Sequence, residues 1–396
     1  MENFTFYSPT YFVFGKETEK QTGAYVKKYG GHKVLIHYGG GSVVRSGLLD
    51  RVKKSLDEEG IEYVELGGVK ASPLSDLIYE GIDLARREKV DFVLALGGGS
   101  VMDSAKGIAL GAVYDGDFWD FYCGKKGPVT EALPGGCVVT IAASGSEGST
   151  DSVVTLVTED GKYYKRCADG DILRPLFAIM NPELTYTLPR YQVTCGIVDI
   201  MMHTLDRYFT HTKGNEMTDE IAAALLRTVI RNGRKALENQ QDYDAMSELM
   251  WCSSLSHNGL TGLGAVTDFG PHKIGHELSA KYDVAHGASL SAVWESWAKY
   301  VCPEEPERFA KYARDVWGVE ETDTEAAARL GIEKTVDYFR SIGMPVSIGE
   351  LETGVRTDDE LRDMARRATL NDTITLANFK KLHQADVYEI LKMANH

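Results

Sequence analysis

The sequence predicts two domains, an α/β domain with a parallel sheet over residues 1–189 and an all-α helical domain over residues 190–396. In the first half, short apolar runs alternate with segments of helical periodicity, which is typical of a parallel sheet covered by helices. After Pro189 long helical periodicities dominate and β-like alternation becomes rare. A length of 396 residues is also large for a single hydrophobic core, which favours two domains.

The elements of the first domain follow from its apolar runs and from the glycines that bound them. One helix is expected to end at Glu59, before Gly60, and another to span 75–88, where apolar residues recur on one face. A further helix is expected after a second glycine turn. The expected strands are 32–38, 61–66, 90–96, 137–142, 153–158 and 177–182.

Composition and charge exclude several classes of partner. The formal net charge is −15, and an acidic surface repels nucleic acids and anionic membranes. No stretch is apolar enough for long enough to span a bilayer, and the first residues lack the basic and apolar regions of a secretory signal. The six cysteines are scattered without a CxxC pair, which suits a reducing compartment. We therefore expect a cytoplasmic protein that binds neither nucleic acid nor membrane.

The first glycine-rich turn, Gly39, Gly40, Gly41 and Ser42, is informative through what it lacks. Dinucleotide sites that select NAD often place a carboxylate where it binds the ribose 2′-hydroxyl and repels a 2′-phosphate. This turn has three glycines and a hydroxyl group instead, and Arg45 follows shortly after. The free space and the nearby cation favour NADP(H) over NAD(H).

A second such turn, Gly97, Gly98, Gly99 and Ser100, directly follows an apolar run and opens a helix. Glycines let the backbone approach a bulky anion, and a helix N-terminus adds the positive end of its dipole. The turn therefore predicts a cradle for a pyrophosphate, but a tight strand-to-helix turn also uses glycines for its shape. Asp103 stands three residues after Ser100, a spacing that indicates a helix cap, a polar contact to the cofactor, or both.

The second half of the chain places an acid and several histidines at helical spacing. Asp199 and His203 are four residues apart, and so are His272 and His276, so the members of each pair share one face of a helix. His286 follows His272 by fourteen residues, which on an unbroken helix would separate them by about 21 Å. That distance is too long for one ion, so the chain is expected to turn in the polar stretch before His286.

One divalent metal ion, Fe²⁺ or Zn²⁺, would suit the resulting donor set. Asp199, His203, His272 and His286 supply one carboxylate oxygen and three imidazole nitrogens. Each histidine alone is more often a satisfied polar residue in a helix bundle. The combination of an acid and several histidines at these spacings, after a domain with two glycine turns, favours the metal site.

Six motifs together are specific for one family of proteins. They are YGGGS (38–42), GGGSVMDSAK (97–106), ASGSE (143–147), TYTLP (185–189), VDIMMHTLD (198–206) and PHKIGHELSAKYDVAHGASL (271–290). Through them the chain resembles the iron-containing, or group III, alcohol dehydrogenases over nearly its whole length. The likeness is greatest to the branch of butanol dehydrogenases and NADPH-dependent aldehyde reductases.

This resemblance implies a Rossmann-like N-terminal domain and a helical C-terminal domain, the dehydroquinate synthase-like fold, with the active site in the cleft between them. It implies that Asp199, His203, His272 and His286 hold the metal and that His276 lies near the nicotinamide. A homodimer is expected on the same ground. From the turns and the resemblance together, the expected cofactor-binding residues are Gly39, Gly40, Gly41, Ser42, Gly97, Gly98, Gly99, Ser100, Asp103, Thr140, Ser144, Ser146 and Lys162.

The expected reaction is hydride transfer between the nicotinamide cofactor and a short-chain alcohol or aldehyde, such as butanol or its aldehyde, with the metal as Lewis acid. His276 either relays a proton or supports the site from outside the ligand set. A glycerol-type dehydrogenase or a dehydroquinate synthase on the same fold stays open as an alternative. A metal-dependent hydrolase and a non-catalytic metal-binding protein are alternatives from other classes, and the hydrolase leaves both glycine turns unexplained.

Overall fold

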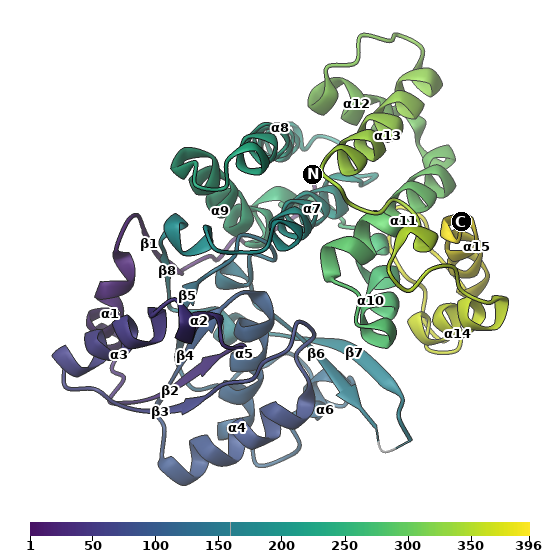
Figure 1. The fold of residues 1–396 in the computed structure, drawn as a ribbon. Helices are drawn as coiled ribbons and strands as arrows, with labels where there is room; N and C mark the ends of the chain where they lie inside the picture. Colours follow the sequence, from purple (N-terminus) through teal and green to yellow (C-terminus); the bar gives the residue numbers. More distant parts are fainter. Residues whose placement is uncertain (159) are drawn as a thin grey trace. The chain divides into compact units, whose positions relative to one another are not determined.

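A parallel sheet forms the centre of one of the two units in this computed structural model, which describes residues 1–158 and 160–396 (Figure 1). The unit with the sheet comprises Tyr7–Thr187, and the other comprises Met1–Phe6 with Leu188–His396. The second unit is built from helices. The domain limit expected after residue 189 stays a prediction.

Six strands form the sheet of the described chain, and every pairing between them is parallel, as the alternation of strands and helices predicts. The strands are β1 (Tyr11–Phe14), β2 (Lys33–Tyr38), β3 (Glu62–Leu66), β4 (Phe92–Gly97), β5 (Gly135–Val139) and β8 (Phe177–Met180). Their order is β1-β8-β5-β4-β2-β3, so the chain runs outward from β2 to β3 and then returns past β2 to β4. β4 is buried along its whole length, which explains its unbroken apolar sequence.

Helices cover both faces of this sheet. The helical segments are α1 (Thr22–Lys28), α2 (Ser42–Arg45), α3 (Leu48–Glu58), α4 (Ser75–Glu88), α5 (Gly99–Val113) and α6 (Trp119–Tyr122), with short 3₁₀ turns η1 (Thr18–Gln21), η2 (Ser146–Gly148), η3 (Asp171–Leu173) and η4 (Pro182–Thr185). Val52 and Leu56 of α3 share one apolar cluster with Val34 and Ile36 of β2. Crossovers between parallel strands are right-handed, and the chain runs from β3 to β4 and on to β5 in the direction opposite to that from β2 to β3. α4 and α5, which pack on each other, therefore lie on the face of the sheet opposite α3.

A two-stranded hairpin lies outside this sheet and contains the strand expected at residues 153–158. β6 (Asp151–Val157) pairs in antiparallel fashion with β7 (Tyr163–Asp169), and in the described chain these two strands form a sheet separate from the parallel one. Neither β7 nor the edge strand β1 was expected. The sequence of β7, YYKRCAD, lacks a regular alternation of apolar and polar residues, so it gives no strand signal.

The second unit is helical in its described residues, as the periodicity after Pro189 predicts. Its helices are α7 (Arg190–Tyr208), α8 (Glu216–Glu238), α9 (Tyr243–His257), α10 (Gly270–Tyr282), α11 (His286–Val301), α12 (Pro306–Trp317), α13 (Thr324–Ser341), α14 (Asp358–Ala368) and α15 (Gln384–Ala394), with 3₁₀ turns η5 (Leu260–Gly262), η6 (Cys302–Glu304) and η7 (Ile348–Glu350). α7 is buried from Ile197 to Tyr208, and α11 is buried over most of its length. These two helices form the core around which the others pack.

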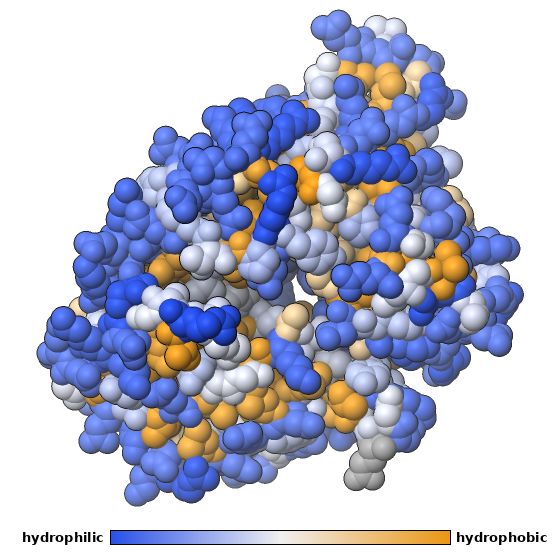
Figure 2. Space-filling model, in the orientation of Figure 1, coloured by the Kyte–Doolittle hydropathy of each residue, from blue (hydrophilic) through white to orange (hydrophobic). Residues whose placement is uncertain are grey.

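Charged and polar side chains cover most of the face shown in Figure 2, and apolar side chains are confined to separate patches. This distribution agrees with the net charge of −15. Among the described residues, no helix combines the length and the apolar character that a bilayer crossing needs.

Candidate functional site

One carboxylate and several imidazoles gather inside the helical unit. Asp199 and His203 lie one turn apart on α7, His272 lies in the first turn of α10, and His286 is the first residue of α11. One ligand atom each from Asp199, His272 and His286 lies within 4.8 Å of the other two. Asp199 Oδ1 is 3.6 Å from His272 Nε2, 3.7 Å from His286 Nε2 and 3.3 Å from His203 Nδ1. The structure thus brings the three expected histidine ligands around one carboxylate oxygen of the fourth, Asp199, and His203 lies at the margin of the group formed by the other three.

The chain turn expected before His286 is present and brings α11 back to α7. α10 ends at Tyr282, and Asp283 then adopts a left-handed conformation (φ 53°). A glycine, Gly287, allows the close approach of the two helices, because a Cβ atom there would lie 2.2 Å from the carbonyl oxygen of Cys195. The distance between Asp199 and His286 therefore depends on this backbone contact.

The buried donor atoms of this cluster fit a cation. Asp199 Oδ1, His203 Nδ1 and His272 Nε2 are buried and make no hydrogen bond to the described residues. Leaving such atoms without a partner is costly, and a divalent ion would satisfy them together. Burial lowers the pKa of His203 well below its ordinary value, so His203 is neutral and offers a lone pair.

A second carboxylate, Asp206, orients His272. Burial opposes protonation of His272, but Asp206 and Asp199 outweigh it and raise the pKa of His272 to about 9. His272 Nδ1 donates to Asp206 Oδ2 at 2.5 Å, and Asp206 is fully buried. This contact leaves Nε2 of the same ring facing Asp199. Asp206 was not among the expected site residues, although its position seven residues after Asp199, on the same face of α7, was a usable signal.

Two further histidines border the cluster. The His276 ring lies 5.3 Å from the His286 ring and 6.4 Å from the His272 ring, as measured between centroids, and is partly exposed. The His257 ring lies 4.0 Å from the His203 ring. His257 was not among the expected site residues, because no spacing in the sequence connects the end of α9 with α7. The rings of His276 and His257 therefore both lie beside expected ligands.

In the sheet unit, the two glycine turns stand next to each other. β2 and β4 are neighbours, with Tyr38 opposite Leu96, so Gly39 and Gly97 leave adjacent carboxyl ends. The strand order reverses direction at this point, and such a position is where open α/β sheets bind ligands.

The turn after β4 needs its glycines for packing. A Cβ atom at Gly99 would lie 2.2 Å from Ser144 Oγ, and one at Gly98 would lie 2.3 Å from a methyl carbon of Ile141. The same close packing brings Ser144 beside the N-terminus of α5, where the positive end of the helix dipole would favour an anion. Ser100 Oγ is bonded to the carbonyl of Ala71.

The loop after β5 is held by Asp103. Ser146 Oγ donates to Asp103 Oδ1 at 2.7 Å, and the Val153 amide donates to Asp103 Oδ2 at 3.1 Å. Burial raises the pKa of Asp103 to about 6. Asp103 does not cap α5, in contrast to the helix cap considered from its spacing, because both of its oxygens bind this loop and the strand after it.

Two expected cofactor residues lie at the borders of this region. The Thr140 amide donates to the Gly97 carbonyl at 3.1 Å, directly below the second glycine turn. Lys162 lies between β6 and β7, is 61% exposed in its side chain and pairs with Asp160 at 2.5 Å.

The turn after β2 is open to solvent. Gly40, Gly41, Ser42 and Arg45 are exposed, and a Cβ atom at Gly41 would lie 2.5 Å from Arg45 Nη1, so the guanidinium lies against the turn. No ion pair involves Arg45 among the residues that the structure describes. The turn thus combines a hydroxyl group with an available cation and has no carboxylate of its own.

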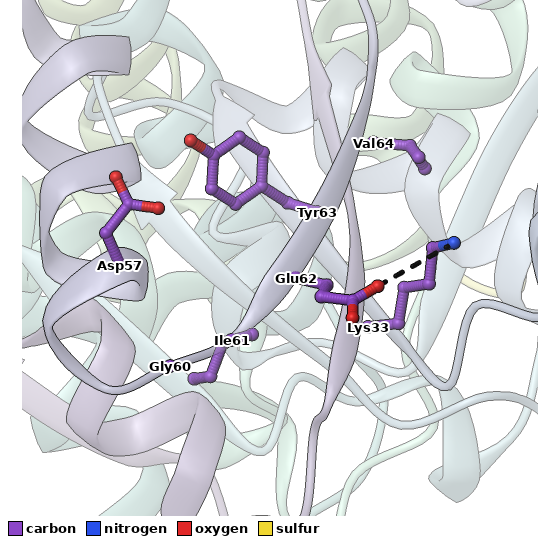
Figure 3. Close-up of a pocket in the computed structure, with 7 residues that line it drawn as sticks. All are labelled: Lys33, Asp57, Gly60, Ile61, Glu62, Tyr63 and Val64. Carbon is purple, nitrogen blue, oxygen red and sulfur yellow. Dashed lines mark ion pairs between the residues drawn. The ribbon is translucent and has the colours of Figure 1, made fainter.

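A surface pocket at the β3 edge of the sheet contains none of the expected site residues. It lies beside the edge strand β3, where Lys33 Nζ is 4.0 Å from Glu62 Oε2. Figure 3 shows this ion pair among the lining residues. The lining residues are Lys33, Asp57, Gly60, Ile61, Glu62, Tyr63 and Val64.

Both halves of the chain match known proteins. Residues 9–182 match the family model described as iron-containing alcohol dehydrogenase, and residues 193–395 match that of the C-terminal part of the Fe-containing alcohol dehydrogenase family. The chain is 38% identical to NADH-dependent butanol dehydrogenase A of Clostridium acetobutylicum over 396 residues, 99% of each chain. It is 33% identical to the NADPH-dependent aldehyde reductase YqhD of Escherichia coli over 354 residues, 88% of this chain and 89% of the relative. The crystal structure of NADH-dependent butanol dehydrogenase A of Thermotoga maritima has a TM-score of 0.95 at 35% identity, covering 100% of this chain and 99% of that one.

Proposed function

This chain belongs to the iron-containing alcohol dehydrogenase family, and on that premise we propose that it interconverts short-chain primary alcohols, such as butanol, and their aldehydes by hydride transfer with a nicotinamide cofactor. The observation that carries the proposal is the convergence of Asp199, His272 and His286 within 4.8 Å. The names of the butanol dehydrogenase and aldehyde reductase relatives support the substrate class.

Asp199, His203, His272 and His286 would hold one divalent metal, Fe²⁺ or Zn²⁺. Such an ion supplies Lewis acidity, which lowers the pKa of an alcohol or polarises a carbonyl. The chain contributes the orientation of the ligands, through the hydrogen bond from His272 to Asp206. His276, beside His286 and partly exposed, is the candidate for moving the proton between substrate and solvent.

The cofactor would be held by the two adjacent glycine turns, with its pyrophosphate at the N-terminus of α5. We propose a preference for NADP(H), because the turn after β2 offers Ser42 and the cation of Arg45 to a 2′-phosphate and has no carboxylate to repel it. The relatives include NADH-dependent and NADPH-dependent enzymes, so the ratio of kcat/KM with NADPH to kcat/KM with NADH tests the preference. A kcat/KM higher with NADH than with NADPH would refute the preference.

The function is tested by anaerobic reconstitution of metal-free protein with Fe²⁺ or Zn²⁺, followed by assays of straight-chain aldehydes with each nicotinamide cofactor. Turnover that requires both the metal and the cofactor is the expected result. The proposal fails if the reconstituted protein binds metal but no nicotinamide cofactor, an outcome that would instead favour a metal-dependent hydrolase.

We also propose that the protein is a cytoplasmic homodimer that binds neither nucleic acid nor membrane. All six cysteines are free, which suits a compartment that keeps thiols reduced. Light scattering coupled to size-exclusion chromatography checks the dimer, and a monomer mass at micromolar concentration would exclude it.

A further inference from the structure

We infer that Lys106 is a positioning residue that fastens the loop 144–151 to α5 and thereby sets the affinity for the nicotinamide cofactor. The inference rests on the proposed function, because the loop carries two of the expected cofactor residues, Ser144 and Ser146. Neither the glycine turns nor the metal cluster explains why an ammonium group is buried at this place. Lys106 is 5% exposed.

The Lys106 ammonium is surrounded by oxygen atoms of this one loop and of the strand that it enters. Lys106 Nζ donates to the carbonyl of Ser146 at 2.9 Å and lies 2.8 Å from Ser146 Oγ. It also donates to the carbonyls of Ser149, at 3.1 Å, and Asp151, at 2.7 Å. An ammonium has three hydrogens, so these four acceptors use its whole donor capacity. The hydrogen bonds that compensate burial of the charge therefore come from this loop and from Asp151 at the start of β6, and the Asp103 carboxylate on α5 adds a favourable charge.

The loop has little regular structure that could hold it in place. It contains a left-handed glycine, Gly145 (φ 68°), and the three-residue turn η2. Asp103, one helical turn before Lys106 on α5, accepts the hydrogen bond from Ser146 Oγ. Ser146 is thus bound from both sides by residues of one helix.

That helix also begins at the second glycine turn, which makes α5 the connection between the turn and the loop. Gly99, its first residue, packs against Ser144 of the loop. Removal of the ammonium would leave the helix and the turn intact, because the hydrogen bonds of α5 are made by the backbone, which the substitution does not change. The loop carbonyls would lose their shared donor, and Ser144 and Ser146 would no longer be held in the arrangement that the cofactor meets.

The test compares full-length wild type with Lys106→Met, which keeps an unbranched apolar stem, shorter by the terminal nitrogen, and removes every donor. We expect the Kd for NADPH, measured by isothermal titration calorimetry, to rise by about tenfold or more, since hydrogen bonds from a charged group are the strong ones. Hydrogen exchange in peptides covering 144–151 should become faster. Zinc content should change by less than about twofold, because the expected metal ligands lie in the other unit. Lys125→Met is the matched control, since Lys125 is 71% exposed in its side chain and pairs with Asp120 on the surface.

An unchanged Kd in a folded Lys106→Met protein would overturn the inference, and so would a raised Kd without faster exchange in the loop. If that variant does not fold, it is replaced by Lys106→Gln, which keeps two donors. A smaller rise in the Kd for NADPH together with faster exchange in the loop then supports the inference. A Kd equal to that of wild type overturns it. Failure of the wild type to bind any nicotinamide cofactor would count against the proposed function itself.

Discussion

Replacement of Asp206 tests whether this carboxylate prepares His272 to bind a metal. Asp206→Ala removes the acceptor of the His272 Nδ1 hydrogen bond, and Asp206→Asn keeps a neutral acceptor in the same place. The other carboxylate oxygen, Asp206 Oδ1, makes no hydrogen bond to the described residues. A change in metal affinity would therefore report on the contact with His272.

Two independent estimates of the metal-binding free energy lost in Asp206→Ala agree. Loss of a hydrogen bond to a charged group costs about 1.5–3 kcal/mol when its partner stays buried. Loss of the partner of a metal-binding histidine typically lowers metal affinity by about 10- to 100-fold, which corresponds to about 1.4–2.7 kcal/mol. We expect a loss of this size for Asp206→Ala. Because charge-assisted hydrogen bonds are about twice as strong as neutral ones, Asp206→Asn should lose about half as much free energy.

The assay is a competition titration of Zn²⁺ between metal-free protein and a chromogenic chelator at one fixed pH. Asp219→Asn is a suitable control, because Asp219 is also a buried carboxylate of the helical unit but pairs with Arg308. That variant should lower stability and leave zinc affinity unchanged. A Kd for zinc within about threefold of wild type in a folded Asp206→Ala protein would refute a positioning role of Asp206.

Further predictions concern packing, pH and metal removal. Gly287→Ala should weaken zinc binding and lower the unfolding free energy by about 1–3 kcal/mol, because its Cβ would meet the Cys195 backbone. The control Gly127→Ala, with open space around it, should do neither, and equal effects of the two would contradict the argument. Burial lowers the pKa of His37 to about 4, from an ordinary value of 6.5. The unfolded chain therefore takes up this proton first, and stability should fall by about 3 kcal/mol between pH 6.5 and pH 4. His37→Gln should flatten this dependence in urea titrations, and an unaltered slope would disprove the assignment. Chelation should abolish turnover while calorimetry still detects NADPH binding; loss of both would show that the cofactor site depends on the metal.

The parallel sheet could be predicted because its central strands are buried on both faces and are therefore apolar without interruption, as in β4. β7 could not, since its side chains include Lys165, Arg166 and Asp169 and show no period. The antiparallel pairing of β6 depends on β7, so the sequence of β6 alone was compatible with a place in the main sheet.

Sequence spacing predicts candidate ligands that lie on one helix, because residues four apart share a helix face, as Asp199 and His203 do on α7. The same argument extends to Asp206, two turns further along. It does not extend to His257, because only the packing of α9 against α7 brings that ring to His203. The local spacing of Asp103 suggested a helix cap, but tertiary hydrogen bonds to Ser146 and Val153 occupy its oxygens instead.

The strand order bears on how the coenzyme preference of such a scaffold can evolve. β2 and β4 are neighbours, but the helices that follow them depart toward opposite faces of the sheet. If the proposed cofactor site is correct, an acidic replacement of the exposed Ser42 would repel a 2′-phosphate without disturbing Gly98 and Gly99, which pack against Ile141 and Ser144. The turn after β2 can therefore change in sequence and alter the coenzyme preference, whereas close packing constrains the turn after β4.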